Sequence, residues 1–252
     1  MTGFSEQIVE RLANASSVTV LTGAGASAES GLPTFRDPDG LWSEFNPVEL
    51  ASYSAFVDNP VRVQSWYSAR LRSSNGVSPN PCHLALAELE DLIESVTVVT
   101  QNVDGLHQRA GSTRVIEVHG SLHRIYCAAC GRDTQELDVA PDASEPARCG
   151  CGGLLRPGVV WFGEMLPEQA LAAAVEASSD CDVFVAIGTS AEVYPAAALP
   201  LHAAKNGATV IEINLGPTPL SAAADEAVFG PAGELTPRLV AQVRARAASR
   251  VN

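Results

Sequence analysis

Short apolar runs alternate with longer amphipathic stretches along the 252-residue sequence. The runs are rich in β-branched residues and apolar at nearly every position, which is typical of parallel strands covered on both faces. They are Val18–Thr22, Val96–Thr100, Val115–Val118, Asp182–Gly188 and Thr209–Asn214. The longer stretches have helical spacing, and they are Ser5–Ala15, Asn59 to about Arg72, Asn80–Ile93, Pro167–Ser178 and Thr236 to about Arg250. This alternation predicts an α/β fold with an open, doubly wound parallel sheet.

Two stretches interrupt the alternation. Residues 34–79 are polar and rich in Pro, with helical spacing but no strand pattern. Residues 125–157 contain four Cys and show little periodicity. We expect both to be insertions that pack together as a smaller module beside the sheet.

Composition and charge narrow the class of protein. Apolar residues make up 46% and charged residues 18% of the chain, which excludes a disordered protein. The net charge of −13 argues against binding to nucleic acid, because a phosphate backbone needs a basic surface. No apolar run approaches the roughly 18–20 residues of a membrane span, and residues 1–11 lack the basic lead and apolar core of a signal peptide. We therefore expect a cytoplasmic protein without membrane contacts.

Four of the six cysteines lie close together, as Cys127-Ala-Ala-Cys130 and Cys149-Gly-Cys151. Paired cysteines on two tight turns can place four thiolates around a tetrahedral Zn²⁺, and a site without an open position is structural. The second pair is one residue shorter than the usual spacing, and a redox pair or two unrelated pairs is the alternative. Cys82 and Cys181 are expected to be core or helix-face thiols.

A glycine-rich turn follows the first predicted strand, as Gly23-Ala-Gly-Ala-Ser-Ala28. Small residues between a strand and a helix let backbone N–H groups approach a pyrophosphate closely. An ordinary dinucleotide-binding fingerprint also needs an acid after a second strand, about 20 residues further on. This chain has the loop Ser30–Asp37 there instead. The turn therefore binds a dinucleotide in an unusual way, or binds none.

Further motifs decide between these alternatives. Six motifs occur in a fixed order along the chain. They are Gly23 to Arg36, Thr100-Gln-Asn-Val-Asp-Gly-Leu-His107, His119-Gly120, the four cysteines, Val159-Val-Trp-Phe-Gly-Glu164 and Gly188-Thr-Ser190. Together they resemble the sirtuins, the NAD-dependent protein-lysine deacylases, over roughly residues 18–237. Ala26, where a larger branched residue is common, and the short second cysteine pair are departures.

The resemblance implies a Rossmann-like doubly wound sheet with a smaller zinc-ribbon and helical module, and a cofactor between them. On this basis residues 1–252 form one catalytic domain. Its Rossmann-like part comprises residues 1–34, 80–124 and 158–252, and the small module comprises residues 35–79 (helical) and 125–157 (zinc-binding). One structural zinc ion is expected on Cys127, Cys130, Cys149 and Cys151.

The resemblance also implies the residues that bind NAD⁺. Those around the first glycine-rich loop are Gly23, Ala24, Gly25, Ala26, Glu29, Thr34, Phe35, Arg36 and Trp42. Those after the second strand are Gln101, Asn102, Val103 and Asp104, of which Asn102 and Asp104 are also expected to be catalytic. Those around the phosphates and adenosine are Gly188, Thr189, Ser190, Asn214, Leu215, Gly216 and Ala232.

His119 resembles the general base of the family. An imidazole is neutral near pH 7 and can take a proton from a ribose hydroxyl. The products implied are lysine, nicotinamide and O-acyl-ADP-ribose. Taken alone, the same histidine would be interpreted as a core residue at a strand end.

Tyr67 and Arg70 are three residues apart on one predicted helix, so both side chains can leave the same face. A guanidinium beside a hydroxyl suits a carboxylate. The pair resembles that of sirtuins which remove succinyl and malonyl groups, whereas in an arbitrary helix Tyr67 would pack and Arg70 would be solvated. Val160, Trp161, Phe162 and Gly163 are the other expected substrate residues, in a stretch that could pair with a peptide strand.

The expected function is removal of succinyl, malonyl and also acetyl groups from lysine side chains of proteins, with consumption of NAD⁺, by a monomer. One alternative is ADP-ribosyl transfer to protein, because the same activated ribose could meet another nucleophile. A second is a zinc-ribbon module that binds without catalysis, which the net charge and the set of His119, Asn102 and Asp104 disfavour.

Overall fold

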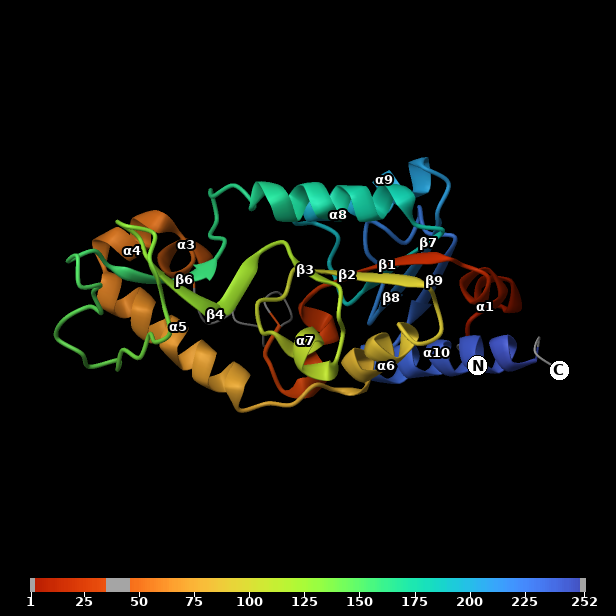
Figure 1. The fold of residues 1–252 in the computed structure, drawn as a ribbon, viewed down its shortest axis with the longest axis horizontal. Helices are drawn as coiled ribbons and strands as arrows, with labels where there is room; N and C mark the ends of the chain where they lie inside the picture. Colours follow the sequence, from red (N-terminus) through yellow and green to blue (C-terminus); the bar gives the residue numbers. More distant parts are fainter. Residues whose placement is uncertain (1–2, 35–45, 250–252) are drawn as a thin grey trace.

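The computed structural model describes residues 3–34 and 46–249. Figure 1 shows an elongated molecule made of two bodies that lie end to end. The larger body holds a parallel sheet between two layers of helices, and the smaller one holds an antiparallel sheet beside a group of helices. Both chain ends lie at the far end of the larger body.

Six parallel strands form the main sheet in the order β3-β2-β1-β7-β8-β9. They are β1 (Ser17–Thr22), β2 (Ser95–Thr100), β3 (Val115–Glu117), β7 (Val183–Ile187), β8 (Thr209–Asn214) and β9 (Glu226–Phe229). The predicted doubly wound α/β fold is therefore confirmed, and all five predicted strands are present within one residue of their expected bounds. The edge strand β9 was not predicted, because its apolar run of Ala227, Val228 and Phe229 is too short to stand out from the neighbouring loop.

Alternate side chains of each strand enter different helical layers. On β1, Val20 belongs to the core cluster that includes Leu12, Leu86 and Leu239, whereas Leu21 belongs to the cluster on the opposite face. The first face is covered by α1 (Glu6–Ala13), α6 (Pro81–Leu89) and α10 (Ala232–Ala248), and the second by α8 (Glu168–Asp180) and α9 (Leu199–Lys205). Burial on both faces explains why these strands are apolar throughout.

The small module contains the three-stranded sheet β5-β4-β6. Its strands are β4 (Gly120–Cys127), β5 (Asp133–Thr134) and β6 (Leu155–Val159), and its helices are α3 (Pro47–Leu50), α4 (Tyr53–Asp58) and α5 (Pro60–Asn75). The fully buried amide of Gln64 on α5 donates to the carbonyls of Leu155 and Ala147 at 2.7 and 2.9 Å, and accepts from Ala147 N–H at 2.8 Å. This helix is thereby fixed to the segment that precedes β6.

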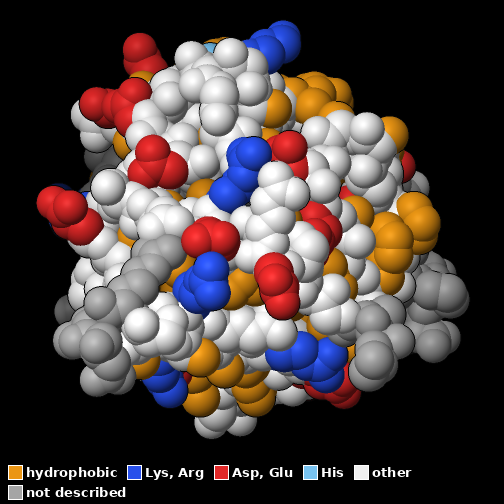
Figure 2. Space-filling view, turned by 90° about the vertical axis from the view of Figure 1, so that its right-hand side faces the viewer, with side chains coloured by type: hydrophobic (Ala, Val, Ile, Leu, Met, Phe, Trp, Pro, Cys, Tyr) orange, Lys and Arg blue, Asp and Glu red, His pale blue; other side chains and the backbone are white. Residues whose placement is uncertain are grey.

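Figure 2 shows the end of the larger body, where acidic and basic side chains are interspersed. Exposed ion pairs of α10 lie at this end, including Arg246 with Glu10 of α1 at 3.0 Å and Arg244 with Glu88 of α6. The face shown has no continuous basic patch among its described residues. No helix in the described part of the chain is long and apolar enough to cross a membrane.

Candidate active site

A cavity of about 780 Å³ lies between the two bodies, at the carboxyl ends of β1, β2, β7 and β8. The chain order of the strands reverses between β1 and β7, and open α/β sheets bind ligands beside such a reversal. The cavity is lined by most of the residues that the sequence predicted for the site: Gly23, Ala24, Gly25, Thr34, Gln101, Asn102, Val103, Asp104, His119, Gly188, Thr189, Ser190, Asn214, Leu215, Gly216, Tyr67, Arg70, Val160, Trp161, Phe162 and Gly163.

Two glycine-containing turns meet at the floor of this cavity. The N–H groups of Gly23 and Gly25 donate to the carbonyls of Ile187 and Gly188, at 3.0 and 2.9 Å. Gly188 has a φ of 58°, and a Cβ there would collide with the backbone nitrogen of Ala26. The close approach therefore requires glycine, and it leaves an open backbone surface that suits a pyrophosphate.

The first turn continues differently from our prediction. Instead of entering an α-helix, residues 23–34 contain two short 3₁₀ turns, Ala24–Ala26 and Ala28–Ser30. Gly31 then adopts a left-handed φ of 90°, and Pro33, which has no N–H group, follows. No dinucleotide-binding α-helix begins within these described residues.

Asn102 and Asp104 line the cavity, and both are largely buried beside the glycine-rich turn. The Asn102 amide donates to the carbonyl of Gly23 at 2.9 Å and to the Ser27 hydroxyl at 3.1 Å. The Asp104 carboxylate accepts from the Ser27 hydroxyl at 2.7 Å and from the N–H of Leu106 at 2.9 Å. The two side chains therefore fix the glycine-rich turn and the loop after β2 relative to each other.

His119 lies at the end of the loop that leads into β4. Its Nδ1 is 3.0 Å from the carbonyl of Gln101, and a carbonyl only accepts, so Nδ1 holds the hydrogen. The lone pair is then on Nε2, which can accept a proton. Burial lowers the pKa of His119 below 6.5 and outweighs the opposing effect of the Gln101 carbonyl, so the ring is neutral at pH 7.

Helix α5 contributes Tyr67 and Arg70 to the cavity, as its i, i+3 spacing predicted. Burial raises the pKa of Tyr67 to about 12 and lowers the pKa of Arg70. The Arg70 guanidinium carbon lies 4.9 Å from the centre of the Trp66 ring. Trp161 faces the pair from the opposite side, and its indole N–H donates to the Tyr67 hydroxyl at 2.9 Å.

Three predicted cofactor residues lie away from the cavity lining. Ala26 is fully buried in the core beneath the turn, and Ala232 is buried where α10 begins. The exposed Glu29 accepts from the N–H of Gly233 at 2.5 Å, because the first turn of α10 presents unpaired N–H groups that favour a carboxylate. Phe35, Arg36 and Trp42, also predicted, lie outside the described residues.

The cavity also has lining residues that sequence reasoning did not select. Ser27, Glu164, Tyr194 and Thr218 are among them. Glu164 is the last residue of the Val159–Glu164 motif, and Ser27 lies within the glycine-rich turn, so both could have been found from the motifs. Tyr194 and Thr218 lie in loops after β7 and β8, where the sequence shows no pattern.

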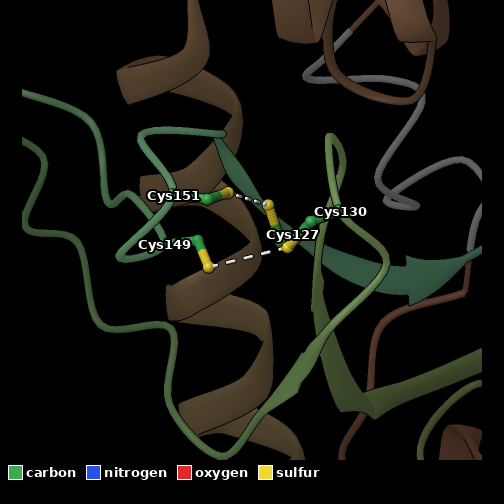
Figure 3. A group of neighbouring side chains, drawn as sticks. All are labelled: Cys127, Cys130, Cys149 and Cys151. Carbon is green, nitrogen blue, oxygen red and sulfur yellow. Dashed lines mark hydrogen bonds between the residues drawn. The ribbon is translucent and has the colours of Figure 1, made fainter.

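The four clustered cysteines face one another between β4 and the turn before β6 (Figure 3). Their sulfur atoms all lie within 4.8 Å of one another, with Cys127 and Cys151 at 3.5 Å and Cys130 and Cys149 at 3.9 Å. Zn–S bonds of about 2.3 Å in a tetrahedron need S···S distances of about 3.8 Å. The four thiols therefore fit a structural zinc ion.

Fold and site together define a class: α/β proteins that bind a dinucleotide in the cleft between a parallel sheet and a zinc-bearing module. A model described as the Sir2 family matches residues 23–195. NAD-dependent protein deacylase 2 of Pyrobaculum aerophilum is 49% identical over 243 residues, which are 96% of this chain and 97% of the relative. The chain belongs to the Sir2 family, whose members are the sirtuins.

Two solved structures extend the comparison to three dimensions. A complex of a Sir2 homologue with NAD aligns with a TM-score of 0.90 and 44% identity, covering 98% of this chain and 96% of that one. A Sir2 protein bound to a myristoylated histone peptide aligns with a TM-score of 0.79 and 37% identity, covering 96% of this chain and 97% of the other.

Proposed function

We propose that this chain is an NAD⁺-dependent protein-lysine deacylase that removes succinyl and malonyl groups in preference to acetyl groups. The observation that carries the proposal is that α5 brings Tyr67 and Arg70 into the same cavity as His119. The deacylase part is supported by family membership and by the name of the P. aerophilum relative. The acyl preference is supported by the chemistry of the two α5 side chains.

The turn from Gly23 to Gly25, packed against Gly188, is proposed to lie against the pyrophosphate, because the absence of side chains allows close approach. Asn214 is proposed to lie beside the adenosine ribose, since its side chain already donates to the carbonyl of Thr189 at 2.7 Å. Gln101 is fixed by donating to the Thr189 hydroxyl at 2.8 Å and lies on the side of His119. The nicotinamide end of the dinucleotide is then proposed to lie next to Asn102 and Asp104, which line the same cavity.

His119 is proposed to act as the general base through Nε2. NAD⁺, when bound, supplies a ribose carbon that accepts the acyl oxygen as nicotinamide leaves. Nε2 of His119 then takes the proton of a ribose hydroxyl, while Nδ1–H stays bonded to the Gln101 carbonyl. That hydrogen bond fixes the ring orientation, so no tautomer change is needed during the transfer.

Arg70 is proposed to bind the carboxylate of the acyl group. Burial disfavours its charged form, and the first opposing effects come from Tyr67 and then from Asp104. An incoming carboxylate would favour the charged form further and accept a charge-assisted hydrogen bond. A neutral acetyl group offers no such partner, so the cavity discriminates between the two acyl classes.

The test replaces Arg70 by Met and compares matched succinyl- and acetyl-lysine peptides by nicotinamide release. R70M should lower kcat/KM for the succinylated peptide by about 10- to 100-fold, the effect of one hydrogen bond to a charged group, and should change the acetylated peptide by less than about threefold. Arg62→Met is the matched control, because Arg62 lies on the same helix with its side chain 52% exposed and paired to Glu49. Equal losses on both peptides in R70M would contradict the carboxylate role.

The mass of the peptide product tests the reaction type in the same experiment. A deacylated peptide, formed together with nicotinamide and O-acyl-ADP-ribose, supports transfer of the acyl group from lysine to ADP-ribose, and an ADP-ribosylated peptide would support the alternative reaction. Protein-borne acyl-lysine as the substrate, a monomeric state and a cytoplasmic location stay predictions.

A further inference from the structure

A buried arginine lies directly beneath the indole ring that borders the acyl site. Arg156 on β6 is 4% exposed, and its guanidinium carbon is 3.6 Å from the centre of the Trp161 ring. Both terminal nitrogens donate to the Glu164 carboxylate, at 2.7 and 2.9 Å, and one also donates to the carbonyl of Val159 at 3.0 Å. Because the two hydrogen bonds to the carboxylate are bidentate, they fix the plane of the guanidinium group.

Hydrogen bonds and ring contacts fix the position of Trp161. Its backbone N–H donates to Glu164 at 2.9 Å, and its ring packs against that of Phe56 with centroids 5.1 Å apart. The indole N–H donates to the Tyr67 hydroxyl at 2.9 Å. Because Trp161 is 2% exposed and its ring is stacked on Arg156, the ring is enclosed by protein with its N–H on the Tyr67 hydroxyl.

This arrangement determines what Tyr67 can offer to a ligand. A phenol has one hydrogen and two lone pairs, and Trp161 occupies a lone pair. Within the described residues, the Tyr67 hydroxyl accepts this bond and donates to no protein group. Burial raises its pKa to about 12, so the hydroxyl keeps its hydrogen at neutral pH. Tyr67 therefore presents a donor, and a donor favours an acyl group that ends in an acceptor such as a carboxylate.

The charge of Arg156 does not itself act on the acyl group, because Glu164 neutralises it locally. Although burial raises the pKa of Glu164, the hydrogen bonds from Arg156 and from Trp161 N–H outweigh that effect and hold it below its usual value. Arg70 then remains the cation that faces the cavity beside Tyr67. A buried ion pair generally adds little to the free energy of unfolding. The role we assign to the pair of Arg156 and Glu164 is instead to fix the indole N–H donor of Trp161.

We propose that Arg156 and Glu164 are positioning residues for acyl selectivity: they hold Trp161 so that its N–H occupies the Tyr67 oxygen and the Tyr67 hydrogen is directed at the acyl carboxylate. The inference rests on the proposed succinyl and malonyl preference. It adds two residues outside the predicted site, of which Arg156 does not line the cavity.

Two variants test the proposal, one by removing the indole N–H and the other by weakening the ion pair. W161F removes the indole N–H but keeps an aromatic ring on Arg156, and E164Q weakens the pair that holds the ring. Both should lower the ratio of kcat/KM for succinyl- over acetyl-lysine peptide by about five- to tenfold, through a higher KM for the succinylated peptide. Because loss of one partner of a buried pair is costly, W161F keeps the test valid if E164Q does not fold. Glu49→Gln, in the exposed pair with Arg62, is the matched control and should leave the ratio unchanged.

A spectroscopic readout separates this inference from the proposed function. With three tryptophans in the chain, ¹⁵N-labelled protein gives a simple indole N–H spectrum, in which W161F identifies the Trp161 signal. Tyr67→Phe and E164Q should each shift that signal, and E49Q should not. A Trp161 signal unmoved by Y67F, or a succinyl-to-acetyl ratio that stays constant in W161F, would overturn the inference. A wild-type enzyme without succinyl preference would instead contradict the proposed function, even if the signal shifts.

Discussion

At the scale of single residues, one hydrogen bond decides how His119 can act. The carbonyl of Gln101 accepts only, so it places the ring hydrogen on Nδ1 and leaves Nε2 as the basic atom. Burial then lowers the pKa of the ring below 6.5. A base that is neutral at pH 7 needs no activation by a neighbouring carboxylate.

The pH dependence of the reaction follows from this lowered pKa. The base must be neutral, and burial holds the pKa of His119 below 6.5, so kcat/KM should fall toward acid pH with a midpoint below 6.5. The measurement is a pH–rate profile with the acetylated peptide, which has no second ionising acyl group. A midpoint for the loss above pH 7 would contradict a buried base.

At the scale of elements, the contact between the turns after β1 and β7 shapes the floor of the cavity. Gly188→Ala should raise KM for NAD⁺ at least about tenfold, because the new Cβ would lie 2.6 Å from the carbonyl carbon of Gly25 and push the first turn into the cofactor space. KM for the peptide should change little, since the residues proposed to contact the peptide belong to other elements.

Gly207→Ala is the control for this substitution. Gly207 also has a left-handed φ, of 95°, but a Cβ there meets nothing within 4 Å. It should cost about 1–2 kcal/mol of stability through backbone strain and leave KM for NAD⁺ unchanged. Equal effects of both substitutions on KM would show that strain, and not the collision, is responsible.

The bond between α5 and the zinc-bearing segment is a second prediction at this scale. Gln64→Ala would remove the partner of the part-buried N–H of Ala147 and a buried donor to the carbonyl of Leu155. At about 1–3 kcal/mol for each unpaired group, it should lower the free energy of unfolding by more than about 2 kcal/mol. Gln135→Ala is the exposed control, and chemical denaturation is the measurement. An effect no larger than that of Gln135→Ala would contradict a structural role for this amide.

The elements show how far the sequence could be interpreted. The buried strands were predictable because helices cover both of their faces. Nearly every position of such a strand is therefore apolar, and the run is visible in the sequence. The cysteine cluster was predictable because spacing alone brings two pairs of thiols to two turns. The helix expected after Gly25 was wrong, since the left-handed Gly31 and Pro33 interrupt the chain there.

Contacts between distant segments could not be predicted. Glu29 pairs with the N-terminus of α10, more than 200 residues away, and nothing local distinguishes it from a cofactor ligand. Arg156 belongs to no motif that we identified in the sequence. Its proposed role follows from its ion pair with Glu164 and from the indole ring of Trp161 stacked on it. Such side chains are recognised only when the fold is known.

At the scale of the whole molecule, the site exists because two bodies meet. The sheet contributes the glycine turns and the loop after β2, while α5 and the stretch after β6 supply the residues proposed to contact the acyl group. The zinc-bearing segment lies on the far side of α5 and is bonded to it through Gln64. A net charge of −13 suits approach of lysine-rich peptides to this cleft.

The central claim is that this cleft joins NAD⁺ and a succinylated lysine in one reaction. The most direct measurement is mass spectrometry of the products formed from NAD⁺ and a succinyl-lysine peptide, with the acetyl-lysine peptide beside it. We predict free-lysine peptide, nicotinamide and O-succinyl-ADP-ribose in equal amounts, formed faster than the acetyl products. Intact NAD⁺, or ADP-ribose attached to a still succinylated peptide, would contradict the account.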